Sequence, residues 1–234
     1  MTARIGVLVF PGTNCEHDVV KAIGSITADE GPASCAELVW HGTKSLTHLD
    51  AVVLPGGFAH GDYLRPGAIA RFSDVMGALA RFAADGGPVV GICNGFQVLT
   101  EAGLLPGALQ KNAGLRFVCT SVSVRVCTKR TVLTEEVEEG RALLLPVNHF
   151  EGNYTCDRAT LDRLRGEDRI VFRYEQNPNG SLDDIAGVCN EAGNVVGLMP
   201  HPERSCDPLT GALDGVPLLR SLLVAAERRA SLPA

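Results

Sequence analysis

Short apolar runs separated by amphipathic segments dominate the first hundred residues of the chain. Runs rich in Val, Ile and Leu that end at Gly or Pro are typical of strands buried on both faces. Residues 15–26 and 68–84 have apolar positions at helical spacing and are predicted helices. The alternation predicts an α/β fold with a mostly parallel, doubly wound sheet. The predicted strands are residues 4–10, 36–41, 51–57 and 88–92.

In the second half of the chain the pattern changes. Residues 115–126 alternate apolar and polar side chains, and residues 141–147 form a further apolar run. Residues 185–200 are predicted to form a hairpin that turns at residues 191–193. We expect these strands to be antiparallel additions to the parallel core. Residues 216–226 have leucines at helical spacing and predict a closing helix.

The acidic segment 135–139 is predicted to be a solvated turn, with a docking surface as the alternative. The chain has no internal repeat, low-complexity segment or linker-like stretch. We therefore predict a single domain over residues 1–234, since α/β folds of this length are common.

Composition and charge exclude several classes of protein. The chain is 45% hydrophobic and 21% charged, which is ordinary for a globular protein. Its net charge of -6 argues against a nucleic acid partner, because phosphate binding needs a basic face. No stretch approaches the ~18 apolar residues that cross a bilayer, and the N-terminus lacks the features of a signal peptide. We expect a cytoplasmic protein that binds neither nucleic acid nor membrane.

Eight cysteines are scattered along the chain without any CxxC pair. This arrangement supports neither a zinc ribbon nor a thioredoxin-like redox motif, so no metal site is predicted. Most of the cysteines are expected to be buried free thiols.

One cysteine lies in a pattern that predicts catalysis. Gly91-Ile-Cys93-Asn-Gly95 places a nucleophile between two glycines, where a predicted strand passes into a predicted helix. Such a turn strains the central residue and leaves no room for flanking side chains. The start of the helix also favours the thiolate form of Cys93. A buried cysteine that only packs at the end of a strand is the alternative.

A nucleophilic cysteine needs a base and a group that orients the base. His201 has the most suitable surroundings, because Pro202 favours an extended backbone in which Glu203 projects to the same side as His201. Pro200 and Pro202 would stiffen this segment, although it could also be an ordinary surface loop.

The sequence Pro55-Gly56-Gly57-Phe58 follows another predicted strand. Glycines there allow backbone N–H groups to approach a reacting carbonyl, as an oxyanion hole requires. A phosphate-binding loop is less well supported, because the chain has no GxxxxGK and no GxGxxG after a strand. In the same loop, Asp62, Tyr63 and Arg65 could line the site or stabilise the loop.

Two other residues compete for these roles. Cys15, with His17 two residues away, is an alternative nucleophile, but it lacks the second glycine of the sharp turn. His149 is an alternative base, or part of a substrate-binding loop with its polar neighbours. The remaining histidines, at positions 41, 48 and 60, are expected to be structural or exposed.

The motifs PGGF, GICNGFQ and PHPE together resemble the class I glutamine amidotransferases, a family with a Cys-His-Glu triad and a flavodoxin-like fold, over nearly the whole chain. Several longer segments resemble the branch of this family that forms the glutaminase subunit of phosphoribosylformylglycinamidine synthase. These segments are FPGTNCEHD (10–18), GGFAHGDYLRPGAIARF (56–72), CNGFQVLTEAGLLPGAL (93–109), HFEGNY (149–154) and MPHPER (199–204).

The resemblance implies a role for each matching position. Cys93 would be the nucleophile, His201 the base and Glu203 its orienting carboxylate. Gly57 and Asn94 would supply the N–H groups of the oxyanion hole. The substrate glutamine would contact Gly56, Gln97, His149 and Phe150. His60 and Phe150 depart from the family pattern, which has an aromatic and a small residue there.

The resemblance also implies partners. In this branch a large ATP-dependent synthetase, with a small accessory subunit in many bacteria, uses the ammonia to convert formylglycinamide ribonucleotide to the amidine. No cofactor is expected in this chain, and ATP and Mg²⁺ are expected on the partner synthetase. A glutaminase of another synthetase, an α/β-type cysteine hydrolase and a non-catalytic binding homologue are the alternatives.

Overall fold

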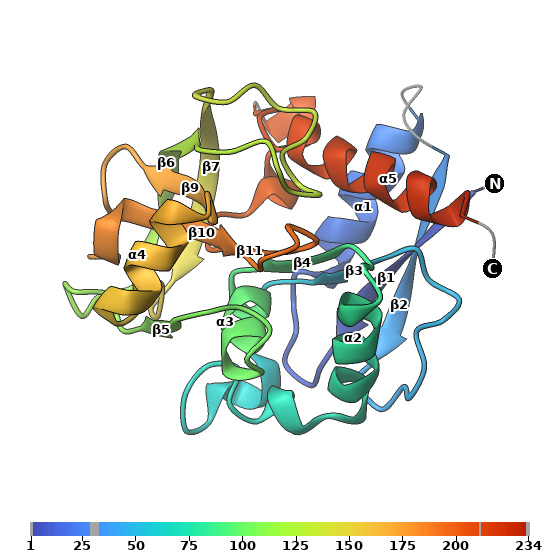
Figure 1. Ribbon diagram of the computed structural model, residues 1–234, viewed down its shortest axis with the longest axis horizontal. Helices are drawn as coiled ribbons and strands as arrows, with labels where there is room; N and C mark the ends of the chain where they lie inside the picture. Colours follow the sequence, from blue (N-terminus) through green and yellow to red (C-terminus); the bar gives the residue numbers. More distant parts are fainter. Residues whose placement is uncertain (1, 29–32, 211, 233–234) are drawn as a thin grey trace.

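The computed structural model describes residues 2–28, 33–210 and 212–232. A nine-stranded sheet crosses the molecule in the order β2-β1-β3-β4-β11-β10-β9-β6-β7, beside a two-stranded ribbon β5-β8 (Figure 1). The strands are β1 Ala3–Val9, β2 Ser34–Trp40, β3 Ala51–Leu54, β4 Val89–Ile92, β5 Ala108–Gln110, β6 Val118–Val126, β7 Ala142–His149, β8 Asn153–Thr155, β9 Ile170–Tyr174, β10 Ile185–Cys189 and β11 Val195–Leu198.

The half of the sheet from β2 to β11 is parallel, as the apolar runs predict. Every residue of β3, β4 and β11 is buried, because helices cover both faces. Helices α1 (Glu16–Ala28) and α5 (Val216–Ala230) lie on one face, and α2 (Asp74–Ala84) and α3 (Asn94–Glu101) on the other (Figure 1). The prediction of a doubly wound α/β fold is confirmed.

The predicted helix over residues 68–84 is wrong in its first part. A 3-10 turn, Ala70–Phe72, comes first, and Ser73 is extended, with φ −66° and ψ 146°, before α2 begins. Gly67, just before this segment, has a φ of +77°, and a Cβ there would lie 2.8 Å from the Val98 nitrogen, so the chain packs closely on α3 at this point. Phe72 matched the helical spacing but is exposed.

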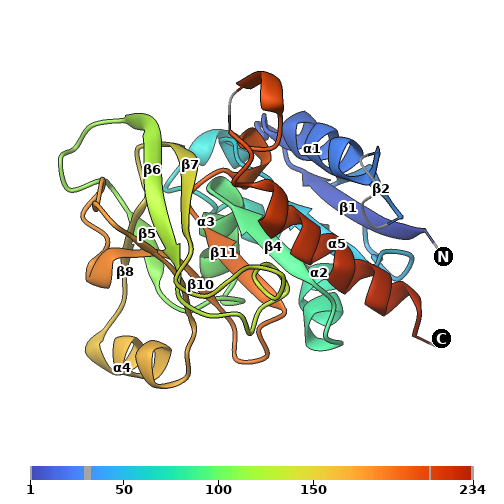
Figure 2. The same ribbon diagram turned by 90° about the horizontal axis from the view of Figure 1, so that it is seen from above.

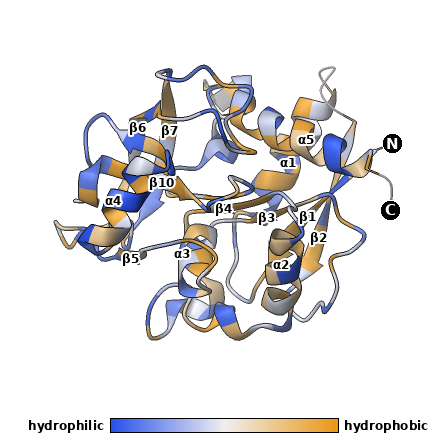
Figure 3. Ribbon diagram, viewed as in Figure 1, coloured by the Kyte–Doolittle hydropathy of each residue, from blue (hydrophilic) through white to orange (hydrophobic). Residues whose placement is uncertain are grey.

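The other half of the sheet is antiparallel and lies to one side of the parallel strands (Figure 2). The predicted hairpin of β10 and β11 is confirmed, and β11 also pairs in parallel with β4, so it joins the two halves. Helix α4 (Arg158–Gly166) was not predicted. It buries only Leu161 and Leu164 and is otherwise mainly hydrophilic (Figure 3), so it has few of the apolar residues from which a helix is predicted.

The acidic segment is only partly solvated. Val137 is fully buried, Ser221 of α5 accepts a hydrogen bond from the Glu136 N–H (3.1 Å), and Arg228 of α5 pairs with Glu135 at 3.0 Å. The segment therefore packs against the closing helix instead of forming a free turn.

All eight cysteines are free thiols. Four are buried, two are half-buried, and Cys35 and Cys119 are exposed, so burial is less general than expected. Within the described residues, no helix has the length and apolar character needed to span a membrane.

Candidate active site

Three neighbouring parallel strands end at one edge of the sheet. The loop after β3 contains Gly56 and Gly57, Cys93 follows β4, and His201 follows β11. Because β4 lies between β3 and β11 and runs parallel to both, these segments meet at one place. This is the edge at which open α/β sheets bind their ligands.

Cys93 lies directly between β4 and α3, with φ 51° and ψ −105°. A positive φ is strained for a residue with a side chain, and here the close packing of the turn imposes it. A Cβ on Gly95 would lie 2.0 Å from the Leu54 carbonyl oxygen, and one on Gly91 would lie 2.5 Å from Leu99 Cδ1. Both glycines are therefore needed for α3 to pack on β3 and β4.

His201 and Glu203 form a buried pair. The Nδ1 atom of His201 lies 2.6 Å from Glu203 Oε1, and the side chains are 2% and 0% exposed. The pair does not come from an extended segment, as the two prolines suggested. Pro202 instead begins a 3-10 turn, Pro202–Arg204, that brings the carboxylate back to the ring.

The protonation of His201 depends on its neighbours. Burial alone would lower the pKa of the imidazole, but Glu203 and the adjacent Cys93 thiol outweigh it and raise the pKa well above its usual value. The arrangement can hold an imidazolium beside a thiolate. It can therefore attack an electrophilic carbon with sulfur and donate a proton to the leaving group.

The loop that contains Gly56 and Gly57 is fixed by the start of α1. The Gly56 carbonyl oxygen accepts hydrogen bonds from the N–H groups of Asn14 (3.4 Å) and Cys15 (3.2 Å), and the Phe58 N–H donates to the Gly12 carbonyl (2.9 Å). In a trans peptide the C=O and N–H point in opposite directions, so the Gly57 N–H points away from α1. Gly57 has a φ of +147°, and a Cβ there would lie 2.7 Å from Thr13 Cα.

The side chain of Asn94 connects this loop to α3. Its Oδ1 accepts a hydrogen bond from the Ala59 N–H (3.0 Å), and its Nδ2 donates to Asp62 Oδ1 (3.1 Å) and Gln97 Oε1 (2.9 Å). Gln97 Nε2 in turn donates to the Glu151 carbonyl (2.5 Å). The oxygen and the nitrogen of the Gln97 side-chain amide thus both form hydrogen bonds within the protein. No pattern in the sequence predicted that the Asn94 side chain would connect this loop to α3.

His149 is buried at the end of β7 near His201. Burial, and then the charge of His201, lower its pKa to about 4, so the ring is neutral at neutral pH. Its Nδ1 lies 3.1 Å from Asn112 Oδ1, and the Asn112 N–H donates to the Phe150 carbonyl (2.8 Å). A neutral ring without a carboxylate partner fits a base less well than His201 does. Asn112, which positions this segment, belongs to no motif in the sequence.

Cys15 lies near the same imidazole. The Cys15 Sγ atom, a ring nitrogen of His201 and a carboxylate oxygen of Glu203 all lie within 4.8 Å of one another. Arg204 Nη2 donates to the Cys15 sulfur at 3.1 Å, and this guanidinium disfavours a metal cation there. His17 is exposed and pairs with Glu16 at 4.0 Å, so it is not a base for Cys15.

The other residues of the loop after β3 differ in their surroundings. Arg65 forms two hydrogen bonds with Glu101 at 2.6 and 2.7 Å and so stabilises the loop. Tyr63 is 73% exposed. Asp62 lines a cavity of about 560 Å³.

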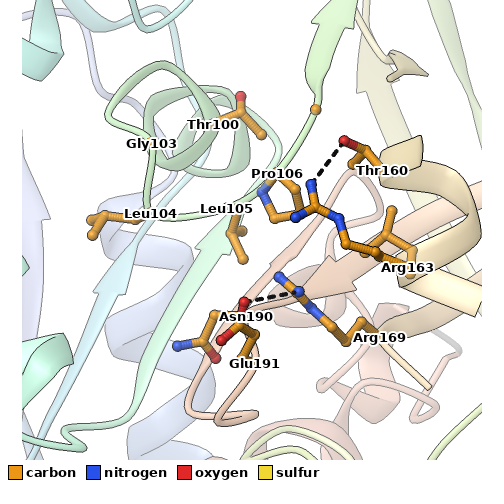
Figure 4. Close-up of a pocket in the computed structure, with 12 residues that line it drawn as sticks. Thr100, Gly103, Leu104, Leu105, Pro106, Thr160, Arg163, Arg169, Asn190 and Glu191 are labelled. Atoms are coloured by element: carbon orange, nitrogen blue, oxygen red, sulfur yellow. Dashed lines mark hydrogen bonds and ion pairs between the residues drawn. The ribbon is translucent and has the colours of Figure 1, made fainter. Parts of the chain in front are cut away.

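A second cavity, of about 640 Å³, lies at the C-terminal end of α3 and contains Arg163, Arg169 and Glu191 (Figure 4). The Glu191 turn precedes β11, whereas His201 follows it. This cavity is therefore at the opposite edge of the sheet from Cys93 and is not part of the same site.

Known proteins resemble this chain over nearly its whole length. Residues 2–213 match the CobB/CobQ-like glutamine amidotransferase domain family. The chain belongs to this family, as a class I glutamine amidotransferase of the PurQ type.

Two curated relatives are named phosphoribosylformylglycinamidine synthase subunit PurQ. The protein from Rubrobacter xylanophilus is 58% identical over 96% of this chain and 99% of its own length. The protein from Koribacter versatilis is 49% identical over 97% of this chain and 100% of its own length. A chain of the PurLQS structure from Thermotoga maritima has a TM-score of 0.84 and 38% identity, covering 96% of this chain and 99% of that one.

Proposed function

We propose that this chain is a glutaminase that hydrolyses glutamine to glutamate and ammonia. The ammonia serves the conversion of formylglycinamide ribonucleotide to formylglycinamidine ribonucleotide in de novo purine biosynthesis, in line with the PurQ relatives. The observation that carries the proposal is that the Cys93 thiol lies on a strained turn beside the His201 imidazole, which is hydrogen-bonded to the buried Glu203 carboxylate. No second function has an observation of comparable weight.

In the first half of the reaction, the Cys93 thiolate attacks the side-chain amide carbon of glutamine and forms a C–S bond. The oxyanion accepts hydrogen bonds from the N–H groups of Gly57 and Asn94. The His201 imidazolium, held by Glu203, gives its proton to the amide nitrogen. The C–N bond then breaks, ammonia leaves, and a γ-glutamyl thioester remains on Cys93.

In the second half, neutral His201 takes a proton from water, and the oxygen attacks the thioester carbonyl. The C–S bond breaks, glutamate leaves, and the thiolate–imidazolium pair is restored. Gly56, Gln97, His149 and Phe150 are proposed to hold the substrate during both steps. The side-chain amide of Gln97 already forms one hydrogen bond through its oxygen and one through its nitrogen. To contact the substrate it would use the second lone pair of the oxygen or the second N–H of the nitrogen.

We propose that a large ATP-dependent synthetase subunit and a small accessory subunit are the partners. ATP and Mg²⁺ belong to the synthetase, and this chain uses no cofactor. The complex is proposed to work in the cytoplasm. We expect low glutaminase activity for the isolated chain and stimulation by the synthetase, and full activity without a partner would contradict this coupling.

The test is to trap the covalent intermediate. The full chain is incubated with glutamine, or with the glutamine-like alkylating agent 6-diazo-5-oxonorleucine, and the adduct is located by intact mass and peptide mapping. We expect one adduct on Cys93 and none on Cys93→Ala. An adduct on Cys15, or esters and peptides hydrolysed in preference to glutamine, would overturn the proposal.

A further inference from the structure

A cavity of about 560 Å³ adjoins the network around Asn94 and Gln97. Its wall combines apolar residues of the loop after β3 and of β5 with charged side chains of both signs. The charged residues that carry the inference are Asp62, Lys111 and Glu151.

Two hydrogen bonds connect this cavity to the nucleophile. Asn94, the residue after Cys93, donates from Nδ2 to Asp62 Oδ1 at 3.1 Å. One turn further along α3, Gln97 donates to the Glu151 carbonyl at 2.5 Å. Single side chains therefore connect the cavity to the residue that follows Cys93 and to the next turn of α3.

The carboxylate of Asp62 has no cationic partner among the described residues. The Arg65 guanidinium, which lines the same cavity, is engaged with Glu101 at 2.6 Å. Burial raises the pKa of Asp62 to about 6, the hydrogen bond from Asn94 opposes this rise, and Glu151 adds to it. A partly buried carboxylate next to a second one is stabilised most by a cation that binds between them.

Lys111 completes the charge pattern. It lines the same cavity, and its Nζ lies 6.0 Å from the centre of the Phe150 ring. Free glutamine carries an α-ammonium and an α-carboxylate at the end opposite its amide. With Arg65 paired to Glu101, the carboxylates of Asp62 and Glu151 and the ammonium of Lys111 are complementary to that end of the molecule.

We propose that Asp62 binds the α-ammonium of glutamine, with Glu151 as a second acceptor and Lys111 facing the α-carboxylate. The assignment rests on the proposed glutaminase function and makes Asp62 the residue that selects free glutamine. A glutamine residue inside a peptide has its α-nitrogen in an amide bond and so has no ammonium at this position. The Asn94 side chain holds the Asp62 carboxylate in place, which couples recognition of the amino acid to the loop of Gly57.

The test compares glutamine with glutaramate, which has the same amide and carboxylate but no α-ammonium. Ammonia release is measured for the full chain with its synthetase partner, and labelling by 6-diazo-5-oxonorleucine is measured for the chain alone. We expect Asp62→Asn to raise KM for glutamine by about 10- to 100-fold, because a hydrogen bond to a charged group is lost. The kcat/KM for glutaramate should change little, so the preference for glutamine collapses.

Three further variants control the result. Asp74→Asn makes the same chemical change at an exposed position outside the cavity and should leave the preference intact. Asp62→Glu keeps the charge and should retain most of the preference. Glu151→Gln should reduce it by a smaller factor than Asp62→Asn. Thermal melting identifies any variant that loses its fold, and the other cavity variants then decide the outcome.

Each result has a defined meaning. If Asp62→Asn and Glu151→Gln keep the glutamine-to-glutaramate preference of the wild type, the assignment of Asp62 is wrong while the glutaminase function stands. If the wild type neither hydrolyses glutamine nor is labelled on Cys93, the proposed function fails and this assignment fails with it.

Discussion

Two strand-to-helix connections of the parallel half each place a cysteine beside His201. One leads from β4 to α3 and contains Cys93, and the other leads from β1 to α1 and contains Cys15. Both cysteines are buried and both come directly before a helix. In both connections, therefore, a cysteine lies at the N-terminal end of a helix and near the His201 imidazole.

They differ in length and in what they bind. Cys93 is the single residue between β4 and α3, and its backbone has a positive φ. The β1 connection is six residues long, from Phe10 to Cys15, and its amides hold the Gly56 carbonyl while Arg204 donates to its thiol. The short, strained turn holds Cys93, the proposed nucleophile, whereas the longer loop supports the neighbouring residues. The local geometry, and not the proximity to histidine, separates the two cysteines.

The largest expected effect is that of Cys93→Ser. A hydroxyl is a much weaker acid than a thiol and a poorer nucleophile here, so the change should reduce glutamate release by more than about 10⁵-fold. Melting temperature should change little, because the side chains are similar in size. Release of glutamate at the wild-type rate would move the chemistry to another thiol, with Cys15 as the first candidate.

The second largest effect is expected for Glu203→Gln, with a loss of about 10³–10⁴-fold in kcat. The His201 imidazole then loses both its orientation and the negative charge that stabilises its protonated form. The pKa of His201 should fall at the same time, because the Glu203 carboxylate helps to raise it. A pH profile of labelling, together with an NMR titration of the ring, checks both effects. An unchanged titration of His201 would contradict the pairing.

Two glycine substitutions, one in α3 and one in α1, compare how closely these two helices pack against the sheet. Gly95→Ala should destabilise the fold by about 3 kcal/mol, since its Cβ would meet the Leu54 carbonyl at 2.0 Å. Gly24→Ala, on the exposed side of α1, has no atom within 4 Å of the new Cβ and should stabilise it by about 0.5–1 kcal/mol. Urea unfolding of the two variants measures the difference, and equal effects would contradict the packing of α3 described above.

The smallest effect is expected for Cys15→Ser. The hydroxyl can still accept a hydrogen bond from Arg204, and the loop amides are unchanged. Activity should therefore stay within about threefold of the wild type, a change in activation free energy below ~0.7 kcal/mol. A loss comparable to that of Cys93→Ser would make Cys15 part of the chemistry.

The parallel half of the fold could be predicted from the sequence because its strands are buried on both faces. Continuous apolar runs such as β3 and β4 follow directly from that burial. The antiparallel half is less regular: α4 buries two leucines, and β5 and β8 have three residues each. Such short or mainly hydrophilic elements form through tertiary contacts that a local pattern does not contain.

The candidate site also has a part that could be predicted from the sequence and a part that could not. The positions of Cys93, His201 and Glu203 could be predicted, because each belongs to a short motif with a local physical reason. The contact of Cys15 with Arg204 joins residues 189 positions apart, and that of Asn112 with His149 joins residues 37 apart. Neither contact has a sequence signal, since each depends on how β1, β7 and β11 are arranged in the sheet.

The hydrogen bonds from Asn14 and Cys15 to the Gly56 carbonyl have a kinetic consequence. A donor that is already oriented towards a developing negative charge requires no reorganisation during the reaction. The Gly56–Gly57 peptide is held by residues of the same chain, so we expect that no peptide flip has to precede the attack of Cys93. Stimulation by a synthetase would then act on substrate entry or on proton transfer by His201, and the rate of thioester formation would not be limited by assembly of the oxyanion hole.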